Sequence, residues 1–269
     1  MAAETHSIVA APAPEAHRAS STFALEGVTV WLGERRALRD VSFDIPHGSV
    51  MALMGAPGCG KSACLRALNR MNETLEGART EGRVRFEGVD VYAPSIDVAW
   101  LRRRAPMVPR APQMFPGSIF DNVAYGPRVA GPSKRSDLEA AVERALSRAG
   151  LWTLLRDRLD DSPRSLARGI QQRLCVARAL ALEPAALLLD EPAATLDPVA
   201  TATLEETLAS LRGEVTVVIV THAAQQAARV SQATAYFHEG SLVEVGETRV
   251  IFTRPRQRAT EDFLTGRFG

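Results

Sequence analysis

The amino-acid sequence predicts an α/β fold with a mainly parallel β-sheet covered by helices on both faces. Short apolar runs, typical of strands, alternate along the chain with stretches whose apolar residues recur at helical spacing. Two of these runs are Ala186–Leu189, which is continuously apolar, and Val215–Val220, which is apolar apart from Thr216. Such runs are typical of strands buried on both faces, and strands that alternate with helices favour parallel pairing.

The first half of the chain supplies one strand, one helix and a basic connection. Ser49–Met54 is predicted as a strand that leads through a Gly-rich turn into a helix from Lys61 toward Arg70. Val84–Glu87 is a short strand candidate. A basic stretch punctuated by prolines then runs from Leu101 to Pro116, and helical spacing returns over Asp137–Ala149.

The second half continues the alternation. Helices are predicted over Ile170–Leu182 and Thr201–Leu211, on either side of the first uninterrupted apolar strand. Tyr236–Val245 is predicted as a hairpin that turns at Glu239-Gly240. The sequence shows no internal repeat and no coiled-coil heptads.

Composition limits the classes of partner. The 269 residues carry a net charge of +1, which gives no general attraction to nucleic acid or anionic lipid. No apolar run reaches the roughly 18 residues that span a bilayer. Residues 1–22 are rich in Ala, Pro, Ser and Thr and are expected to form a disordered tail instead of a secretion signal. The three cysteines suit a reducing cytosol and support no disulfide framework.

A phosphate-binding loop follows the first predicted strand. The pattern G-x-x-x-x-G-K-[ST] is matched by Gly55, Ala56, Pro57, Gly58, Cys59, Gly60, Lys61 and Ser62. Glycines allow the tight backbone that turns successive N–H groups toward phosphate oxygens, and the helix that follows favours negative charge at its start. Lys61 can then reach the β- and γ-phosphates, and Ser62 can ligate Mg²⁺. The strand before the loop and the helix after it argue against a chance Gly-rich turn.

Three further candidates follow buried strands. Asp190 and Glu191 end the run that starts at Ala186, where ligands of α/β folds bind. Asp190 would hold Mg²⁺ through water, and Glu191 would act as general base. An acidic pair at a helix N-terminus is the alternative for these two. His222, after Thr221, can contact the γ-phosphate or orient the water, although a lone His is usually structural.

The order of these motifs resembles the ATP-binding subunits of ABC transporters from about Phe23 to the C-terminus. Among them, the chain is most similar to the ATP-binding subunits of bacterial phosphate importers. The segments that carry the resemblance are Leu65–Asn72, Phe115–Asn122, Gln171–Arg178, Leu196-Asp197, Val217–His222, Gln225–Arg229 and Thr260–Gly269.

The resemblance implies a P-loop NTPase core with a mainly parallel sheet, an antiparallel β subdomain and a helical signature subdomain. Residues 23–264 would form the ATPase domain, with the helical subdomain inserted at about 101–165, and residues 265–269 would form a C-terminal tail. The cofactors would be ATP and Mg²⁺, and the activity would be ATP hydrolysis coupled to phosphate uptake.

The resemblance also implies partners. Two membrane-spanning permease subunits and a second ATP-binding subunit, in a homodimer or a heterodimer, would place the chain peripherally on the cytoplasmic face of the cell membrane. An extracytoplasmic phosphate-binding protein would act indirectly, and nucleic acid would not be a partner. Each ATP would lie between one subunit's phosphate loop and the other's signature segment.

The signature segment departs from the family pattern Leu-Ser-Gly-Gly-Gln. The aligned residues are Leu166, Ala167, Arg168, Gly169 and Ile170. Ala167 cannot donate a hydrogen bond to the γ-phosphate, which costs about 1.5–3 kcal/mol for a charged acceptor. Arg168 either compensates as a cation that faces the γ-phosphate or points to solvent.

Other departures lie elsewhere around the expected site. Arg110 stands where the family has a Gln for Mg²⁺ and water, and Gln113 could replace that Gln only if the loop rearranged. Leu32 stands where an aromatic residue stacks on adenine, and the neighbouring Trp31 either stacks there or packs in the core. Ala194-Thr195 replaces Ser-Ala before Leu196, and Ala63 replaces a second hydroxyl after Ser62.

These departures leave a second function open beside the importer ATPase. A degenerate ATP-binding paralogue with slow or no hydrolysis could act as a regulatory subunit or heterodimer partner. Intact Glu191 argues for hydrolysis and the altered signature against it. A small-molecule kinase would leave Glu191 and His222 without a purpose, and a chromosome ATPase of this superfamily would need long coiled-coil insertions.

Overall fold

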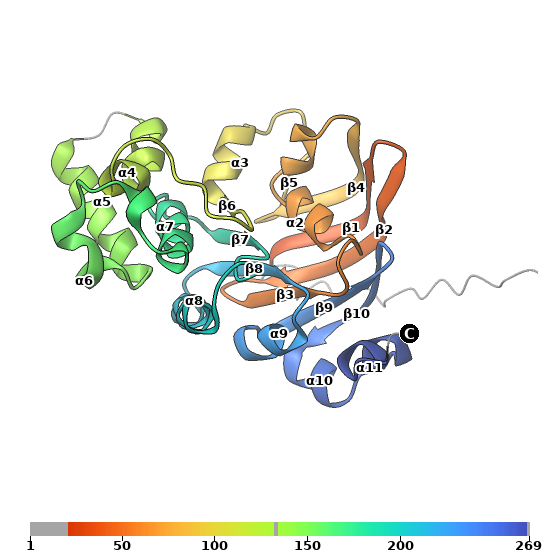
Figure 1. Ribbon diagram of the computed structural model, residues 1–269. Helices are drawn as coiled ribbons and strands as arrows, with labels where there is room; N and C mark the ends of the chain where they lie inside the picture. Colours follow the sequence, from red (N-terminus) through yellow and green to blue (C-terminus); the bar gives the residue numbers. More distant parts are fainter. Residues whose placement is uncertain (1–20, 132–133, 268–269) are drawn as a thin grey trace, which may run out of the picture.

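The computed structural model describes residues 21–131 and 134–267 and contains two sheets and a separate layer of helices (Figure 1). Most of the tail expected at residues 1–22, and the last residues of the tail expected at 265–269, lie outside the described residues. Ser21 and Thr22 already belong to the first strand. Among the described residues, no helix is both long enough and apolar enough to cross a membrane.

The central sheet has six strands in the order β10-β9-β3-β8-β7-β6. Strands β9, β3, β8, β7 and β6 run parallel, and β10 is antiparallel to β9. The three central strands are buried at every residue, as their mostly apolar sequences predict. The bounds are β3 Val50–Met54, β6 Met107–Val108, β7 Ala186–Asp190, β8 Thr216–Thr221, β9 Ala233–His238 and β10 Ser241–Glu247.

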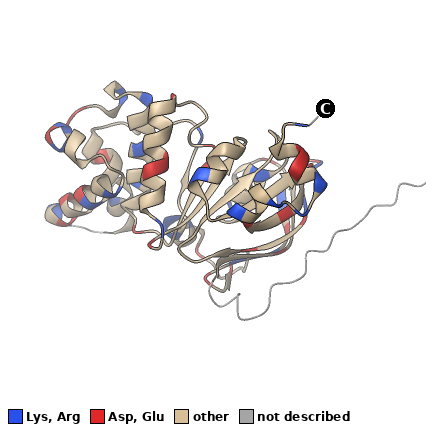
Figure 2. Cartoon of the chain, turned by 90° about the horizontal axis from the view of Figure 1, so that it is seen from below, with Lys and Arg blue, Asp and Glu red and all other residues tan. Residues whose placement is uncertain are grey.

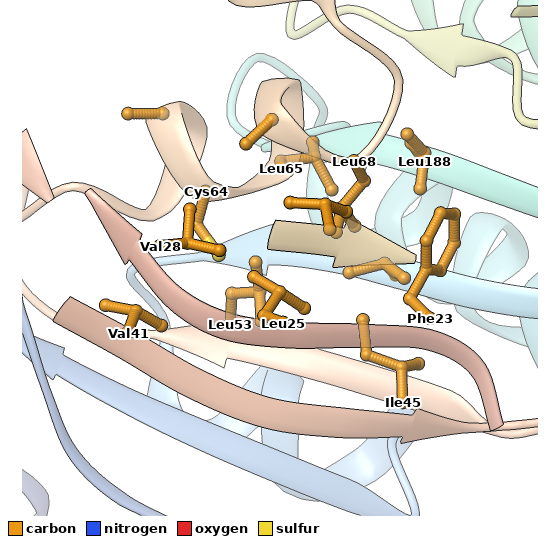
Figure 3. Close-up of a cluster of buried hydrophobic side chains, with 14 of the residues drawn as sticks. Phe23, Leu25, Val28, Val41, Ile45, Leu53, Cys64, Leu65, Leu68 and Leu188 are labelled. Atoms are coloured by element: carbon orange, nitrogen blue, oxygen red, sulfur yellow. The ribbon is translucent and has the colours of Figure 1, made fainter. Parts of the chain in front are cut away.

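A second, antiparallel sheet has the order β2-β1-β4-β5. Its buried side chains, Phe23 and Leu25 among them, share one hydrophobic cluster with Leu53 of the central sheet and with Leu65 and Leu68 (Figure 3). The helix that follows the phosphate loop is therefore packed between the two sheets. The bounds are β1 Ser21–Leu32, β2 Arg35–Pro46, β4 Ala78–Phe86, β5 Val89–Asp90 and the helix α2 Lys61–Ala67.

Helices cover both faces of the central sheet. A second hydrophobic cluster lies on the face opposite to α2 and joins the sheet to α7, α8, α9 and α10. Asp197 caps α8, because its side chain accepts a hydrogen bond from the backbone N–H of Ala200 at 2.9 Å. The bounds are α3 Val98–Arg104, α7 Arg168–Leu180, α8 Pro198–Ser210, α9 Ala224–Val230, α10 Thr248–Thr253 and α11 Arg258–Leu264.

The helical layer lies to one side of the sheets and has a cluster of its own (Figure 1). Its helices are α4 Ile119–Ala130, α5 Arg135–Arg148 and α6 Trp152–Leu155, and α7 connects it to the central sheet. Ser118 and Asp121 form a capping box that begins α4. Charged residues of both signs are interspersed over the described part of the chain (Figure 2).

The predicted fold class is confirmed, including the parallel core, the antiparallel subdomain and the helical segments. The predicted hairpin turn at Glu239-Gly240 joins β9 to β10. The strand predicted over Val84–Glu87 was too short, because β4 begins at Ala78 with mostly exposed residues that pairing with β1 holds in place. The predicted helix from Lys61 ends at Ala67, before Arg70 adopts a left-handed backbone conformation.

The first part of the segment expected to form the helical subdomain, from about 101, packs with the sheets. Leu101 on α3 is fully buried in the cluster between the two sheets, and Val108 lies in the central sheet beside β7. The first member of the helical cluster is Ile119. The basic stretch therefore crosses from the sheet to the helical layer and belongs to both.

Candidate functional site

Parallel pairing brings the ends of three central strands to one edge of the sheet. Met54, the last residue of β3, pairs with Thr221, and Asp190, the last residue of β7, pairs with Val220. The residues that follow these strands are Gly55, Glu191 and His222. The phosphate loop, the acidic pair and the histidine that the sequence singled out are thus brought to the same edge.

Glycine is required at two positions of the phosphate loop. Gly55 and Gly60 have φ angles of 148° and 106°. A Cβ atom at Gly55 would lie 2.2 Å from the carbonyl oxygen of Phe237, and one at Gly60 would lie 2.5 Å from that of Ala37. Ala56, Pro57 and Gly58 are exposed, and Cys59 is buried. Side chains at these two positions would collide with β9 and β2, so glycine allows the loop to form a cradle packed against both sheets.

Lys61 points back into this cradle. Its side chain is almost wholly buried, and its Nζ donates to the carbonyl oxygens of Gly55 and Ala56, each at 2.7 Å. The ammonium also lies 3.6 Å from Cys59 Sγ. A cation held inside a glycine-lined loop suits the phosphate groups of a nucleotide.

Asp190 is held by two residues of α2. Ser62 Oγ donates to Asp190 Oδ1 at 2.7 Å, and Arg66 Nη2 donates to Oδ2 at 3.1 Å. The hydroxyl and the carboxylate are adjacent oxygen donors, which suits Mg²⁺ when phosphate oxygens and waters complete its shell. The contact of Arg66 with Asp190 was not predicted from the sequence. It could have been, because Arg66 follows Ser62 by four residues and so lies on the same face of the helix.

A second group of charges surrounds Glu191. His222 Nδ1 and Arg110 Nη1 lie 3.5 and 3.4 Å from the same oxygen, Glu191 Oε2. Glu191 has a left-handed φ of 46°, and its N–H donates to the carbonyl oxygen of Val220 at 3.1 Å. The carboxylate is thus directed toward His222 and Arg110. In the loop that follows β6, the residue that contacts Glu191 is Arg110.

The cysteine that packs beneath the loop is inert. Cys64 on α2 is fully buried between the two sheets, and burial raises the pKa of its thiol. A thiol that stays protonated behaves as a small apolar side chain. Cys64 therefore belongs to the core that supports the phosphate loop.

The altered signature segment makes contacts elsewhere in the same chain. Ala167 is the N-cap of α7 and provides no side-chain cap. Arg168 Nε donates to Thr195 Oγ1 at 3.1 Å, and both residues line a pocket of about 240 Å³ with Leu196 and Asp197. Arg168 is exposed, which agrees with the solvent-facing orientation among the two expected for it. The guanidinium is bound to the loop that precedes α8.

Trp31 is covered by two arginines. It pairs across the antiparallel sheet with Arg36 on β2 and Arg79 on β4, whose guanidinium carbons lie 5.9 and 4.4 Å from the centre of its ring. Cation–π contacts of this kind use the face on which a nucleobase would stack. The ring therefore packs against basic side chains in this structure.

Comparisons with known proteins agree with this geometry. The chain is similar to CbiO1 from Clostridium perfringens, described as part of the ABC transporter complex CbiONQ, with 24% identity and a TM-score of 0.77 over 92% of this chain and 97% of that one. It is also similar to a bacterial Atm1-family ABC exporter with ATP bound, with 24% identity and a TM-score of 0.75 over 93% of this chain and 42% of that one. At this level of identity the two structures establish the fold.

The family is established by a separate match. Residues 38–194, more than half of the chain, match the ABC transporter family. This range contains the phosphate loop, Asp190 and Glu191. The chain belongs to the ABC transporter family, as an ATP-binding subunit.

Proposed function

We propose that this chain hydrolyses ATP on the cytoplasmic face of the cell membrane and thereby drives the import of inorganic phosphate. The observation that carries the proposal is the meeting of Lys61, Ser62, Asp190, Glu191 and His222 at one edge of the central sheet. Phosphate as the transported ion rests on the similarity of Leu65–Asn72, Phe115–Asn122 and Thr260–Gly269 to phosphate importers.

Each residue has a role in this proposal. Residues 55–62 bind the phosphates of ATP, and Lys61 exchanges its two loop carbonyls for β- and γ-phosphate oxygens. Ser62 and Asp190 hold Mg²⁺, which neutralises charge on the transferring phosphoryl group. Glu191 accepts a proton from the attacking water, and His222 orients that water through the shared oxygen Glu191 Oε2.

The domain limits follow as part of the proposal. Residues 23–264 form the ATPase domain, with the helical subdomain inserted at about 101–165. Val199 on α8 is 77% exposed and lines the same pocket as Arg168. An exposed valine beside the signature segment supports a second ATP-binding subunit as the partner on this face.

A groove supports the proposed contact with the membrane subunits. It has a volume of about 340 Å³ and lies between the basic stretch, α4 and α7, with Phe115, Tyr125, Val129 and Leu182 among its walls. Arg178 lies in it, over the ring of Phe115 at 4.0 Å, and burial lowers the pKa of its guanidinium. Its guanidinium donates to Asn122 Oδ1 at 3.3 Å and to Cys175 Sγ at 3.5 Å, and neither partner carries a charge that balances it. An apolar helix that ends in acidic or carbonyl groups fits such a groove, and we assign it to a permease subunit.

A degenerate subunit is the second candidate function. The specific observation in its favour is the hydrogen bond of Arg168 to Thr195, together with the missing side-chain donor at Ala167. A signature segment bound within its own chain offers fewer donors to a nucleotide on a partner subunit. Hydrolysis would then be slow, and the chain would act as a regulatory subunit or in a heterodimer.

Lys61→Ala should remove most nucleotide affinity. The β- and γ-phosphate charges lose their main side-chain partner, and charge-assisted hydrogen bonds are the strong ones. Calorimetric titration with Mg·ATP measures the loss. Unchanged affinity would contradict the phosphate-loop assignment.

Glu191→Gln should keep Mg·ATP binding and lower turnover. The amide is nearly isosteric but cannot accept the proton, so a loss of about 10²–10⁴-fold is expected. Steady-state phosphate release measures turnover, and titration of the same variant measures binding. Equal turnover in wild type and variant would rule out Glu191 as general base.

Restoring the signature should raise turnover by about tenfold or more. The triple variant Ala167→Ser, Arg168→Gly, Ile170→Gln regains a hydroxyl and a close backbone approach, and each tenfold corresponds to about 1.4 kcal/mol. The measurement is phosphate release at saturating Mg·ATP, with and without membrane subunits. Thr195→Val is the matched control, because it breaks the Arg168 contact without restoring a donor. A wild-type rate already typical of ATPases would contradict the degenerate subunit.

Val129→Glu should weaken assembly with the membrane subunits by about tenfold or more. Val129 is 65% exposed in the groove, so a carboxylate there disrupts apolar docking without affecting the core. Co-purification with a co-expressed pair of phosphate-permease subunits measures assembly. Val89→Glu, at a valine 46% exposed on the antiparallel sheet, is the control. Equal recovery of both variants would contradict the assignment of the groove.

A further inference from the structure

Strand pairing places Arg110 beside Glu191. In the pairing of β6 with β7, Met107 lies opposite Leu188 and Val108 opposite Leu189. Continuing this register by two residues brings Arg110 level with Glu191. The pairing of β6 with β7 therefore sets the position of Arg110, as strand pairing also sets the positions of the other site residues.

The loop that carries Arg110 is anchored from below. Gln172 on α7 is fully buried, and its Nε2 donates to the carbonyl oxygen of Pro109 at 2.9 Å. Prolines at 109 and 112 flank Arg110 and restrict the backbone on both sides. The guanidinium thus extends from a fixed point.

The contact between Arg110 and Glu191 is a weak one. The two charges are 3.4 Å apart, and the Arg110 side chain is 61% exposed. Exposed ion pairs contribute about 0–1 kcal/mol. Glu191 is the one carboxylate that lies within ion-pair distance of Arg110 in the described part of the chain. Most of the five N–H donors of the guanidinium therefore remain available to a stronger anion.

Arginine cannot perform the task that the resemblance gives to glutamine at this position. A guanidinium is cationic and has no acceptor, so it cannot ligate Mg²⁺. It binds phosphate well, because its planar donors match two phosphate oxygens. The γ-phosphate is the group that distinguishes ATP from ADP, and Glu191 is proposed to hold the water that attacks it. A residue in contact with Glu191 is therefore within reach of that phosphate.

We propose that Arg110 binds the γ-phosphate and discriminates ATP from ADP within a single chain. This inference rests on the proposed function, because it takes the position of the γ-phosphate from the roles of Lys61 and Glu191. Arg110 would leave Glu191 Oε2 when ATP binds, which frees the carboxylate for water. The guanidinium would thereby supply a contact to the γ-phosphate from the same chain that binds the nucleotide. It would replace the hydrogen bond that the altered signature segment of a partner subunit no longer offers.

The test compares the affinities for two nucleotides. Wild type, Arg110→Gln, Arg110→Lys and Arg104→Gln are titrated by calorimetry with ADP and with a non-hydrolysable ATP analogue, each with Mg²⁺. Arg104 is a matched control, since it forms an exposed ion pair with Glu87 at 3.0 Å, away from the site.

Arg110→Gln should lower the affinity for the ATP analogue about 10- to 100-fold, as expected for the loss of a hydrogen bond to a charged group. The affinity for ADP should stay within about twofold of the wild-type value. Arg110→Lys should recover part of the loss, and Arg104→Gln should bind both nucleotides as wild type does. An unchanged ratio of the two affinities in Arg110→Gln would overturn the proposal, even if turnover rose because Glu191 was freed. Failure of the wild type to bind either nucleotide would overturn the proposed function as well.

Discussion

The parallel register of β3, β8 and β7 is the constraint on which the rest of the structure depends. Backbone hydrogen bonds place Met54 beside Thr221 and Val220 beside Asp190, so segments far apart in the sequence end at the same edge. A slip by one residue would turn every side chain of a strand to the other face, so residues fitted to one buried cluster would enter the other and disturb the packing of both. The packing of the core therefore determines the arrangement of the candidate site.

The phosphate loop depends on the same core through steric contacts. Gly55 and Gly60 approach backbone carbonyls of β9 and β2 too closely for any side chain. These carbonyls belong to the two sheets that enclose α2, so the shape of the loop is set by both sheets at once. Lys61 then satisfies the loop's own carbonyls from inside. The shape of the cradle is thus set by the core, and Lys61 lies inside it.

Sequence patterns predict the parts of this chain that depend on local chemistry. Uninterrupted apolar strands, helical spacing and the glycine-rich loop are visible without tertiary contacts, and the family match agrees with the resemblance that they carry. Strands β1 and β2 were not predicted, because register shifts in their pairing interrupt the alternation of apolar and polar residues. The contacts of Arg66 with Asp190 and of Arg110 with Glu191 join residues of different strands and helices. The sheet register brings each pair together. The spacing of Ser62 and Arg66 along α2 is a local signal for the first contact, and the second has no local signal in the sequence.

The two arginines at the candidate site differ in a way that the burial of their partners explains. Arg66 lies on a helix packed between the two sheets, and its Nη2 is 3.1 Å from Asp190 Oδ2. The Asp190 side chain is only 9% exposed, so this contact holds it in place. Arg110 is mostly exposed, and water weakens its attraction to Glu191 to about 1 kcal/mol or less. Arg168, the other unusual cation of this chain, is bound to Thr195. Relative to the family pattern, a donor is missing from the segment that would face a partner subunit, and a cation is added beside the chain's own acidic pair. Both departures add an arginine, but Arg168 is hydrogen-bonded to Thr195 within its own chain, whereas the mostly exposed Arg110 lies beside Glu191.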